Sequence, residues 1–144
     1  MVLSDIRQIR RYHPSAVIIS SDVSDYTVVA DQTDPVQLVS SLHELFCRFD
    51  RLAKKYGIVK VKTVGDGYLA CAGLFDNFEK GQNNQGSAIL AQNALSFALD
   101  MLEEVSEHNA AHPNERKISI RVDMHCGKVL SGVVGHSKIQ FDIF

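Results

Sequence analysis

Residues 58–74 read IVKVKTVGDGYLACAGL, and this stretch decides the fold. Over residues 58–64 valines alternate with lysines, which is the period of a strand with one covered face. The glycines on either side of Asp66 indicate a tight turn, and residues 68–74 return as a second, more apolar strand. The stretch therefore predicts a β-hairpin with Asp66 at its tip.

An amphipathic helix is predicted on each side of this hairpin. In the first helix Asp34 can act as N-cap, Pro35 suits the first helical position, and Gly57 stands just past the end. The second helix is predicted over residues 87–108, after a polar loop at 76–86. Apolar residues repeat at steps of three and four in both helices, so each has one face for a sheet. The predicted faces are Leu38, Leu42, Leu45, Phe49, Leu52 and Tyr56 in the first helix, and Ala91, Ala94, Leu95, Ala98, Leu102 and Val105 in the second.

The first strand is predicted in the β-branched run at residues 16–20, which is typical of a buried strand. It ends at Asp22, and residues 23–33 are predicted to be a loop or a short helical turn. Residues 1–15 are interpreted as a lead-in segment, either the end of a connecting helix or a disordered end.

Further strands are predicted near the C-terminus. Residues 118–125 alternate apolar and polar side chains, as a half-covered strand does. A turn is predicted at Cys126-Gly127, followed by a short strand at 128–134. Residues 141–144 are predicted to begin one more strand.

The predicted order is β-α-β-β-α-β with an appended strand, an α+β plan of the ferredoxin-like kind. In such a sheet the third strand lies between the first and second, and neighbouring strands are antiparallel. The end of the first strand and the tip of the hairpin then lie at the same edge. We therefore expect Asp22 and Asp66 to come together, although they are far apart in the sequence.

Two converging carboxylates restrict the chemistry at this edge. At a separation of about 4 Å they repel by roughly 4 kcal/mol at an effective dielectric of 20. The pair is tolerated if a cation lies between them, if one is protonated, or if solvent screens them. Mg²⁺ and Mn²⁺ suit such ligands, and a pair of these ions can assist phosphoryl-type displacements. The alternative is that Asp22 and Asp66 are ordinary turn residues.

Composition favours one soluble domain. The chain has 144 residues, of which 45% are hydrophobic and 22% charged, so it can bury a core. Its formal net charge of −2 disfavours a nucleic-acid-binding protein, which usually carries a basic excess. Apolar runs of the roughly 20 residues that span a bilayer are absent from the sequence, and no secretory signal peptide is recognisable.

The spacing of the cysteines and histidines indicates neither a disulfide framework nor a metal site. Cys47, Cys71 and Cys126 are odd in number and widely spaced, so we interpret them as reduced thiols of a cytosolic protein. His108 and His112 are four residues apart beside a proline. We interpret them as part of a surface helix terminus rather than as metal ligands.

Five stretches of the chain resemble, in order, the motifs of class III nucleotide cyclases. Residues 21–27 (SDVSDYT) resemble the first metal motif, and residues 62–68 (KTVGDGY) resemble the second. Residues 71–74 are similar to the strand that follows it, and residues 125–135 to the later glycine-rich hairpin. Residues 141–144 (FDIF) are similar to the start of the purine-reading segment.

The resemblance implies a reaction and its metal ligands. In this family two ions, Mg²⁺ or Mn²⁺, bind ATP or GTP, and the ribose 3′-hydroxyl attacks the α-phosphate to give a cyclic nucleotide and pyrophosphate. By resemblance Asp22 and Asp66 hold both metals, with the Val23 carbonyl as a further ligand. The catalytic residues would be the two aspartates.

The triphosphate cradle is implied by the same resemblance. The backbone amides of Ser24, Asp25, Tyr26 and Thr27 are similar to the amides that hold the triphosphate in the family. Family members usually have glycine where Asp25 stands. A carboxylate near a triphosphate is unfavourable unless it points away or touches a metal.

Two positions of the family select the purine. Adenylate-type members have lysine and aspartate there, and guanylate-type members have glutamate and a small residue such as cysteine. The matching residues here are Lys62 and Asp142, so the resemblance implies ATP as substrate. A guanylate cyclase and a non-catalytic module that binds nucleotide or a partner chain remain as alternatives.

The resemblance also implies an assembly. Active sites of the family form between two chains, one supplying the metal aspartates and the other the purine-reading pair. Because this chain carries both sets, we expect a head-to-tail homodimer, with a heterodimer left open.

The family continues beyond the segment that matches residues 141–144, with an asparagine and an arginine that serve the transition state and a later lysine. We therefore expect residues 16–144 to be a catalytic domain without its C-terminal part, weakly active or inactive alone. We expect it to be cytoplasmic, or the cytoplasmic domain of a membrane protein held through domains absent here.

Overall fold

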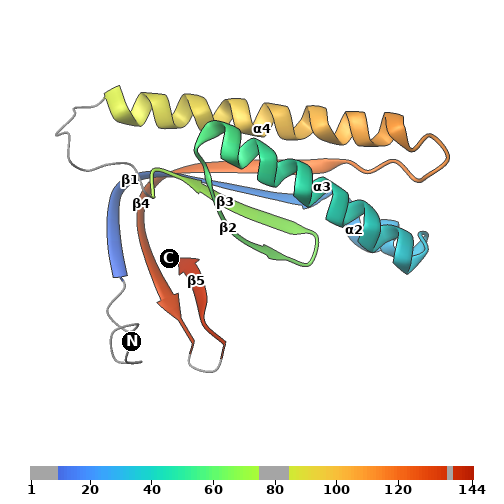
Figure 1. Cartoon of the computed structure of the whole chain (residues 1–144), viewed down its shortest axis with the longest axis horizontal. Coiled ribbons are helices and arrows are strands. Elements are labelled where there is room, and N and C mark those ends of the chain that lie inside the picture. The colour runs from blue at the N-terminus through green and yellow to red at the C-terminus, as the bar shows by residue number, and fades with distance from the viewer. Residues whose placement is uncertain (1–9, 75–84, 136–137) are drawn as a thin grey trace.

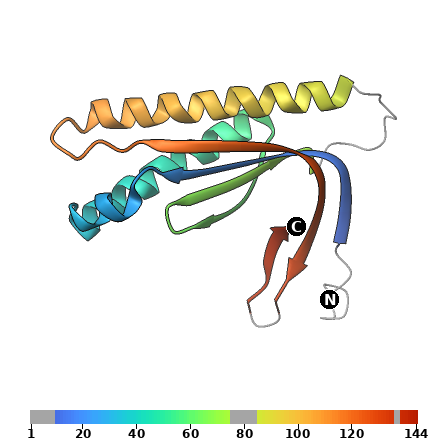
Figure 2. The same cartoon turned by 180° about the vertical axis from the view of Figure 1, so that it is seen from behind.

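The computed structural model describes residues 10–74, 85–135 and 138–144. In these residues an antiparallel sheet in the order β2-β3-β1-β4-β5 carries the helices on one face (Figures 1 and 2). The α+β plan and the place of β3 between β1 and β2 are confirmed. The elements are β1 (Arg10–Val23), α2 (Tyr26–Asp31), α3 (Pro35–Tyr56), β2 (Val59–Val64), β3 (Gly67–Ala72), α4 (Gln85–Ala111), β4 (Ile120–Val134) and β5 (Gln140–Ile143).

The two longest strands are longer than the sequence predicted. β1 begins at Arg10, so residues 10–15 belong to the sheet and not to a helix or a disordered end. The predicted turn at Cys126-Gly127 is wrong, because β4 runs through it without a break. Cys126 pairs with Val17, and Gly127 pairs with Ala16. The extra residues of β1 pair with β4 beyond Gly127, from Val129 to Gly132, so β4 continues as one strand across an irregularity in register between His13 and Ala16.

The curvature of the sheet creates a second, smaller core on the face away from the helices. β1 and β4 bend together, and β5 follows them away from α3 and α4 (Figure 2). Successive residues of a strand point to opposite faces, so Ile19 packs under the helices while Ile18 packs in the smaller core. The buried members of this smaller core are Ala16, Cys71, Leu74 and Val129.

Helix α3 has the predicted start, end and buried face. Asp34 accepts a hydrogen bond from the backbone N–H of Gln37 at 3.0 Å, as an N-cap does. Gly57 ends the helix with a positive φ of 65°, a conformation that glycine adopts without a steric penalty. Phe49 of the buried face packs edge-on against Tyr68 of β3, with ring centroids 5.5 Å apart.

Helix α4 buries only part of the predicted face: Ala94, Ala98 and Val105 are buried as predicted, but Leu95 and Leu102 are not. Phe97 and Met101 are fully buried, whereas Leu95 is 49% exposed and Leu102 is 46% exposed. Because apolar residues occupy several sides of this helix, their spacing alone cannot select the side that faces the sheet. Among the described residues no helix is both long and apolar enough to cross a membrane.

The C-terminal end of α4 differs from the prediction in the burial of one histidine, whereas the cysteines are as predicted. The helix ends at Ala111, close to the predicted terminus, but His108 is buried rather than on the surface. All three cysteines are free, as predicted. Burial raises the pKa of the Cys71 thiol to about 11, so this thiol stays protonated near neutral pH. Most of the predicted loop at 76–86 lies outside the described residues, and its last two residues belong to α4.

The corrected face of α4 predicts a stability difference between two neighbouring substitutions. We expect Phe97→Ala to lower the free energy of unfolding by about 3–5 kcal/mol, because it leaves a cavity under the helix. Leu95→Ala should change it by only about 0.5 kcal/mol, because that side chain is half exposed. Urea unfolding followed by circular dichroism measures both. A larger loss for Leu95→Ala would mean that the face predicted from the sequence is the buried one.

Candidate active site

Asp22 and Asp66 lie at the same edge of the sheet, as the topology predicted. Asp22 is the penultimate residue of β1, and Asp66 is in the turn between β2 and β3. The backbone N–H of Val23 donates a hydrogen bond to Oδ2 of Asp66 at 2.9 Å. This bond fixes the tip of the hairpin against the end of β1. The two aspartates are therefore brought together by the sheet itself.

An open cleft of about 500 Å³ lies at this edge. Its walls come from the end of β1, the start of α2, the tip of the hairpin and the start of β4. Apart from Ser24, the lining includes every residue predicted for the metals and the triphosphate. The lining residues are Asp22, Val23, Asp25, Tyr26, Thr27, Val28, Asp66 and Arg121.

Arg121 is a site residue that the sequence did not reveal. It pairs with Asp22 across β1 and β4, and its Nε and Nη2 atoms each lie 2.8 Å from Oδ1 of Asp22. In the sequence it is one polar member of an alternating strand. Only the register of β4 against β1 identifies it, because that register sets it opposite the metal-motif aspartate. It adds a fixed positive charge to an otherwise acidic cleft.

The two aspartates have the oxygen atoms that hard divalent cations require. Oδ1 of Asp22 is engaged by Arg121, and Oδ2 of Asp66 is engaged by Val23. The other oxygen of each carboxylate makes no hydrogen bond or ion pair to the part of the chain that the structure describes. Mg²⁺ and Mn²⁺ prefer such carboxylate oxygens together with substrate phosphates. The residues present therefore fit the predicted metal ions.

The turn before α2, which the resemblance predicts to hold the triphosphate, has a backbone conformation that favours glycine at the position of Asp25. Asp25 has φ 52° and ψ 39°, the left-handed conformation, and is the N-cap of α2 without a side-chain capping bond. Among the described residues it is the only non-glycine residue with positive φ. Aspartate tolerates this conformation better than most residues, but glycine adopts it without the steric cost.

The predicted cradle of amides is shorter than the sequence suggested. The backbone N–H of Ser24 donates to the carbonyl of Ser119 at 2.8 Å, so this amide is used within the fold. The amides of residues 25–27 stand at the first turn of α2, where helical N–H groups have no intrahelical partner. The expected cradle is therefore limited to residues 25–27.

Lys62 and Asp142 form an ion pair, although they come from the two edge strands of the sheet. The distance from Nζ of Lys62 to Oδ2 of Asp142 is 2.5 Å, and both side chains are mostly buried. The curvature of the sheet brings β2 and β5 together. The hydrogen bond from Lys62 holds the pKa of the Asp142 carboxyl below its usual value, so this carboxyl is ionised at neutral pH. Neither residue lines the cleft of the two aspartates.

Comparison with known proteins identifies the family. A sequence profile of the adenylate and guanylate cyclase catalytic domain matches residues 9–144. The chain belongs to this family. The recognition of a class III cyclase domain from the five motifs is therefore confirmed.

Relatives of this cyclase domain include proteins of both substrate types. The receptor-type guanylate cyclase Gyc76C of Drosophila melanogaster is 32% identical over 127 residues, which are 88% of this chain and 8% of that protein. The germination-specific adenylate cyclase of Dictyostelium discoideum is 32% identical over 131 residues, which are 90% of this chain and 14% of that protein. The chain thus spans only a small part of these relatives.

Solved structures confirm the cyclase fold. The catalytic core of a rhodopsin-guanylyl cyclase with converted specificity, in complex with ATPαS, superposes with a TM-score of 0.77 at 27% identity. That match covers 95% of this chain and 68% of the other. The adenylyl cyclase CyaB from P. aeruginosa has the same TM-score at 18% identity, over 94% of this chain and 67% of the other.

The left-handed turn predicts how two substitutions of Asp25 differ. Both Asp25→Gly and Asp25→Ala remove the carboxylate, but only glycine relieves the steric cost of positive φ. We expect Asp25→Gly to be more stable than Asp25→Ala by about 1 kcal/mol in free energy of unfolding. Parallel urea titrations of both variants and the native domain measure the difference. Equal stability of the two variants would show that the turn carries no such strain in solution.

Proposed function

We propose that this chain is the catalytic domain of an adenylate cyclase, which converts ATP to 3′,5′-cyclic AMP and pyrophosphate. The observation that carries the proposal is the Lys62–Asp142 pair, with Nζ and Oδ2 2.5 Å apart. In this proposal the pair would offer one donor and one acceptor to the same edge of the base. A pocket of about 110 Å³ adjoins it, lined by Lys62 with residues of β1 and the hairpin.

The chemistry of this pair matches adenine. Lysine only donates hydrogen bonds, and N1 of adenine is an acceptor. An ionised aspartate only accepts, and the 6-amino group of adenine is a donor. Guanine has a carbonyl at position 6 and a proton on N1, so both contacts would be mismatched. Buried polar mismatches of this kind discriminate strongly between substrates.

The choice between ATP and GTP needs an experiment, because the relatives include cyclases of both substrate types. The relatives named above include a guanylate and an adenylate cyclase, so family membership alone does not select the purine. In the family, guanylate-type members have glutamate and a small residue at the two purine-reading positions. This chain has Lys62 and Asp142 there, which supports ATP.

The aspartate cleft would serve the phosphates of the substrate. Asp22, Asp66 and the Val23 carbonyl would hold two Mg²⁺ or Mn²⁺ ions. When bound, such ions neutralise a triphosphate, lower the pKa of the ribose 3′-hydroxyl and stabilise the leaving pyrophosphate. Arg121 lies in the same cleft, and its planar guanidinium suits bidentate contact with phosphate oxygens. We propose that Arg121 exchanges its contact with Asp22 for a phosphate when the nucleotide binds.

The active form would be a head-to-tail homodimer. Each chain carries both the metal-binding and the purine-reading residues, but the lining of the aspartate cleft includes neither Lys62 nor Asp142. This separation fits active sites that are completed by a second chain. Dimerisation by a two-fold axis would give two equivalent sites. One solved relative is described as a non-canonical dimeric guanylyl cyclase domain.

The proposed location is the cytoplasm, either free or as the cytoplasmic domain of a membrane protein. The three free cysteines fit a reducing compartment. Several curated relatives are receptor-type cyclases, so attachment to a membrane would occur through other domains.

A non-catalytic, nucleotide-binding module is the second candidate. Its support is Asp25, an acidic residue that lines the cleft where the triphosphate would lie. A negative charge there opposes nucleotide binding unless a cation compensates it. This candidate predicts nucleotide binding without formation of cyclic AMP.

Exchanging the purine-reading pair tests the substrate. We expect Lys62→Glu combined with Asp142→Cys to lower kcat/KM for ATP by at least about tenfold and to make GTP the better substrate, because each lost contact is worth about 1–2 kcal/mol. Lys60→Gln, on the same strand, is the matched control and should keep the preference for ATP.

Two measurements serve this test: formation of cyclic AMP and cyclic GTP with Mn²⁺, and binding of 3′-deoxy-ATP and 3′-deoxy-GTP, which lack the attacking hydroxyl. An unchanged preference for ATP in the double variant would contradict the assignment of Lys62 and Asp142. Selective binding of the adenine nucleotide with no cyclic AMP formed would favour the non-catalytic module.

Mixing two inactive variants tests the shared site. Asp66→Asn should abolish activity through the metal cleft, and Lys62→Glu should abolish it with ATP through the purine pocket. A mixed dimer of the two has one site with only native residues, so an equal mixture should recover about a quarter of the native activity. Cyclic AMP formation after mixing measures this, in a form of the protein whose native dimer has measurable activity. A mixture as inactive as its components would exclude sites built from two chains.

A further inference from the structure

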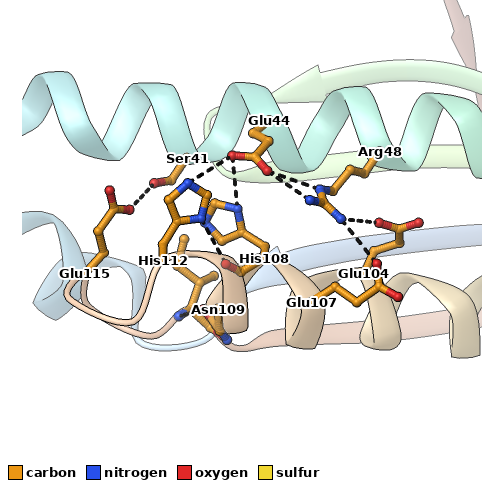
Figure 3. A network of polar contacts seen from close by, with 10 residues as sticks. Ser41, Glu44, Arg48, Glu104, Glu107, His108, Asn109, His112 and Glu115 are labelled. Atoms are coloured by element: carbon orange, nitrogen blue, oxygen red, sulfur yellow. Dashed lines mark hydrogen bonds and ion pairs between the residues drawn. The ribbon is translucent and has the colours of Figure 1, made fainter.

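Three potential metal ligands meet where the end of α4 crosses α3, outside the aspartate cleft (Figure 3). They are Glu44 of α3, His108 of α4 and His112, which follows α4 directly. One ligand atom from each residue lies within 4.8 Å of the others. None of the three lines the cleft described above. The cluster is therefore independent of the proposed catalytic metals.

The distances in this cluster suit a tetrahedral ion. Oε2 of Glu44 lies 3.3 Å from Nδ1 of His108 and 3.6 Å from Nε2 of His112. Zinc bonds of about 2.0–2.1 Å at tetrahedral angles separate neighbouring ligand atoms by roughly 3.3 Å. The two contacts of Glu44 are thus close to tetrahedral spacing, and the ligand nitrogens of the two histidines lie within 4.8 Å of each other.

His108 provides an independent sign of a missing ligand. Its side chain is only 3% exposed, and among the described residues its Nδ1 atom has no hydrogen-bond partner. Its close polar neighbour is Oε2 of Glu44 at 3.3 Å, an ion-pair contact within the cluster itself. Buried polar atoms in native structures nearly always have a partner, and an unsatisfied one needs an explanation.

His112 and Glu44 are oriented in the way metal ligands usually are. Nδ1 of His112 lies 2.9 Å from the carbonyl of His108, and a carbonyl only accepts, so Nδ1 carries the proton. In the neutral ring the lone pair is then on Nε2, which faces Glu44. The other carboxylate oxygen of Glu44, Oε1, is engaged by Arg48 at 3.0 Å. Such outer contacts fix the orientation of ligands around a metal.

The backbone around the cluster is also held in place. The side chain of Asn109 makes two hydrogen bonds to the backbone of Ile118, at 2.8 and 2.9 Å. Arg48 in turn is bound to Glu104 of α4 at 2.7 Å, which ties the two helices together beside the cluster (Figure 3). The three ligand atoms therefore converge on a rigid part of the fold.

We propose that Glu44, His108 and His112 bind a zinc ion, with water at the fourth position. Two imidazoles and one carboxylate form a donor set that zinc accepts and that Mg²⁺ does not favour. The ion would link α3 to the end of α4, from which a short connection leads to β4 and Arg121. The role assigned to the ion is to stabilise this end of the domain.

Zinc titration of the intact chain tests this proposal. Calorimetry with Zn²⁺ would be done in excess Mg²⁺, so that the aspartate cleft does not contribute. Co²⁺ is the second probe, because its visible spectrum reports tetrahedral nitrogen and oxygen ligands. The variants are His112→Gln and Glu44→Gln, which leave buried His108 in place, and circular dichroism verifies their folding.

The matched control is His43→Gln. His43 is an exposed histidine of α3 next to Glu44, and its Nε2 lies 3.6 Å from Sγ of Cys47. We expect one Zn²⁺ per chain, a higher melting temperature with zinc, and an affinity at least tenfold lower in His112→Gln and in Glu44→Gln. His43→Gln should bind zinc as the native chain does.

Three results would overturn the proposal. One is the absence of stoichiometric zinc binding by the native chain. Another is unchanged affinity in folded His112→Gln or Glu44→Gln. The third is loss of binding in His43→Gln, which would assign the ion to His43 and Cys47 instead.

Discussion

The pairing of β1 with a strand on each side is the constraint on which the rest of the structure depends. β3 pairs with β1 from Val17 to Ser21, and β4 pairs with it along almost its whole length. These two ladders set the hairpin tip and the start of β4 beside the end of β1. Asp22, Asp66 and Arg121 meet there because of backbone hydrogen bonds made elsewhere in the sheet. The geometry of the cleft is thus a property of strand register.

Local signals in the sequence were sufficient for the hairpin and for α3. The hairpin is marked by a two-residue period and by glycines around Asp66. Helix α3 is marked by its N-cap, its first-turn proline and its terminal glycine, and each of these signals acts within a few residues of the chain. These signals, with the order of the elements, also predicted that Asp22 and Asp66 converge. The five family motifs then identified the cyclase domain without any structural information.

What the sequence did not reveal depends on contacts between distant segments. The buried side of α4 was predicted only in part, because apolar residues surround much of the helix and only the sheet distinguishes Phe97 from Leu95. β4 crosses Cys126-Gly127 because β1 supplies a partner there. Arg121 becomes a site residue through its register with Asp22. The Glu44–His108–His112 cluster exists only because α3 and α4 cross, and spacing within α4 alone suggested an exposed terminus.

The curvature that joins Lys62 to Asp142 has a further consequence for solubility. The outer edges of a sheet present unpaired N–H and C=O groups, which can recruit strands from other chains and start aggregation. Here the two edge strands, β2 and β5, are turned toward each other across the smaller core, and a charged pair lies between them. Lysine on an edge strand discourages such recruitment. The same side chains that would recognise a base therefore also oppose edge-to-edge strand pairing with other chains, which is a different contact from the proposed dimer interface.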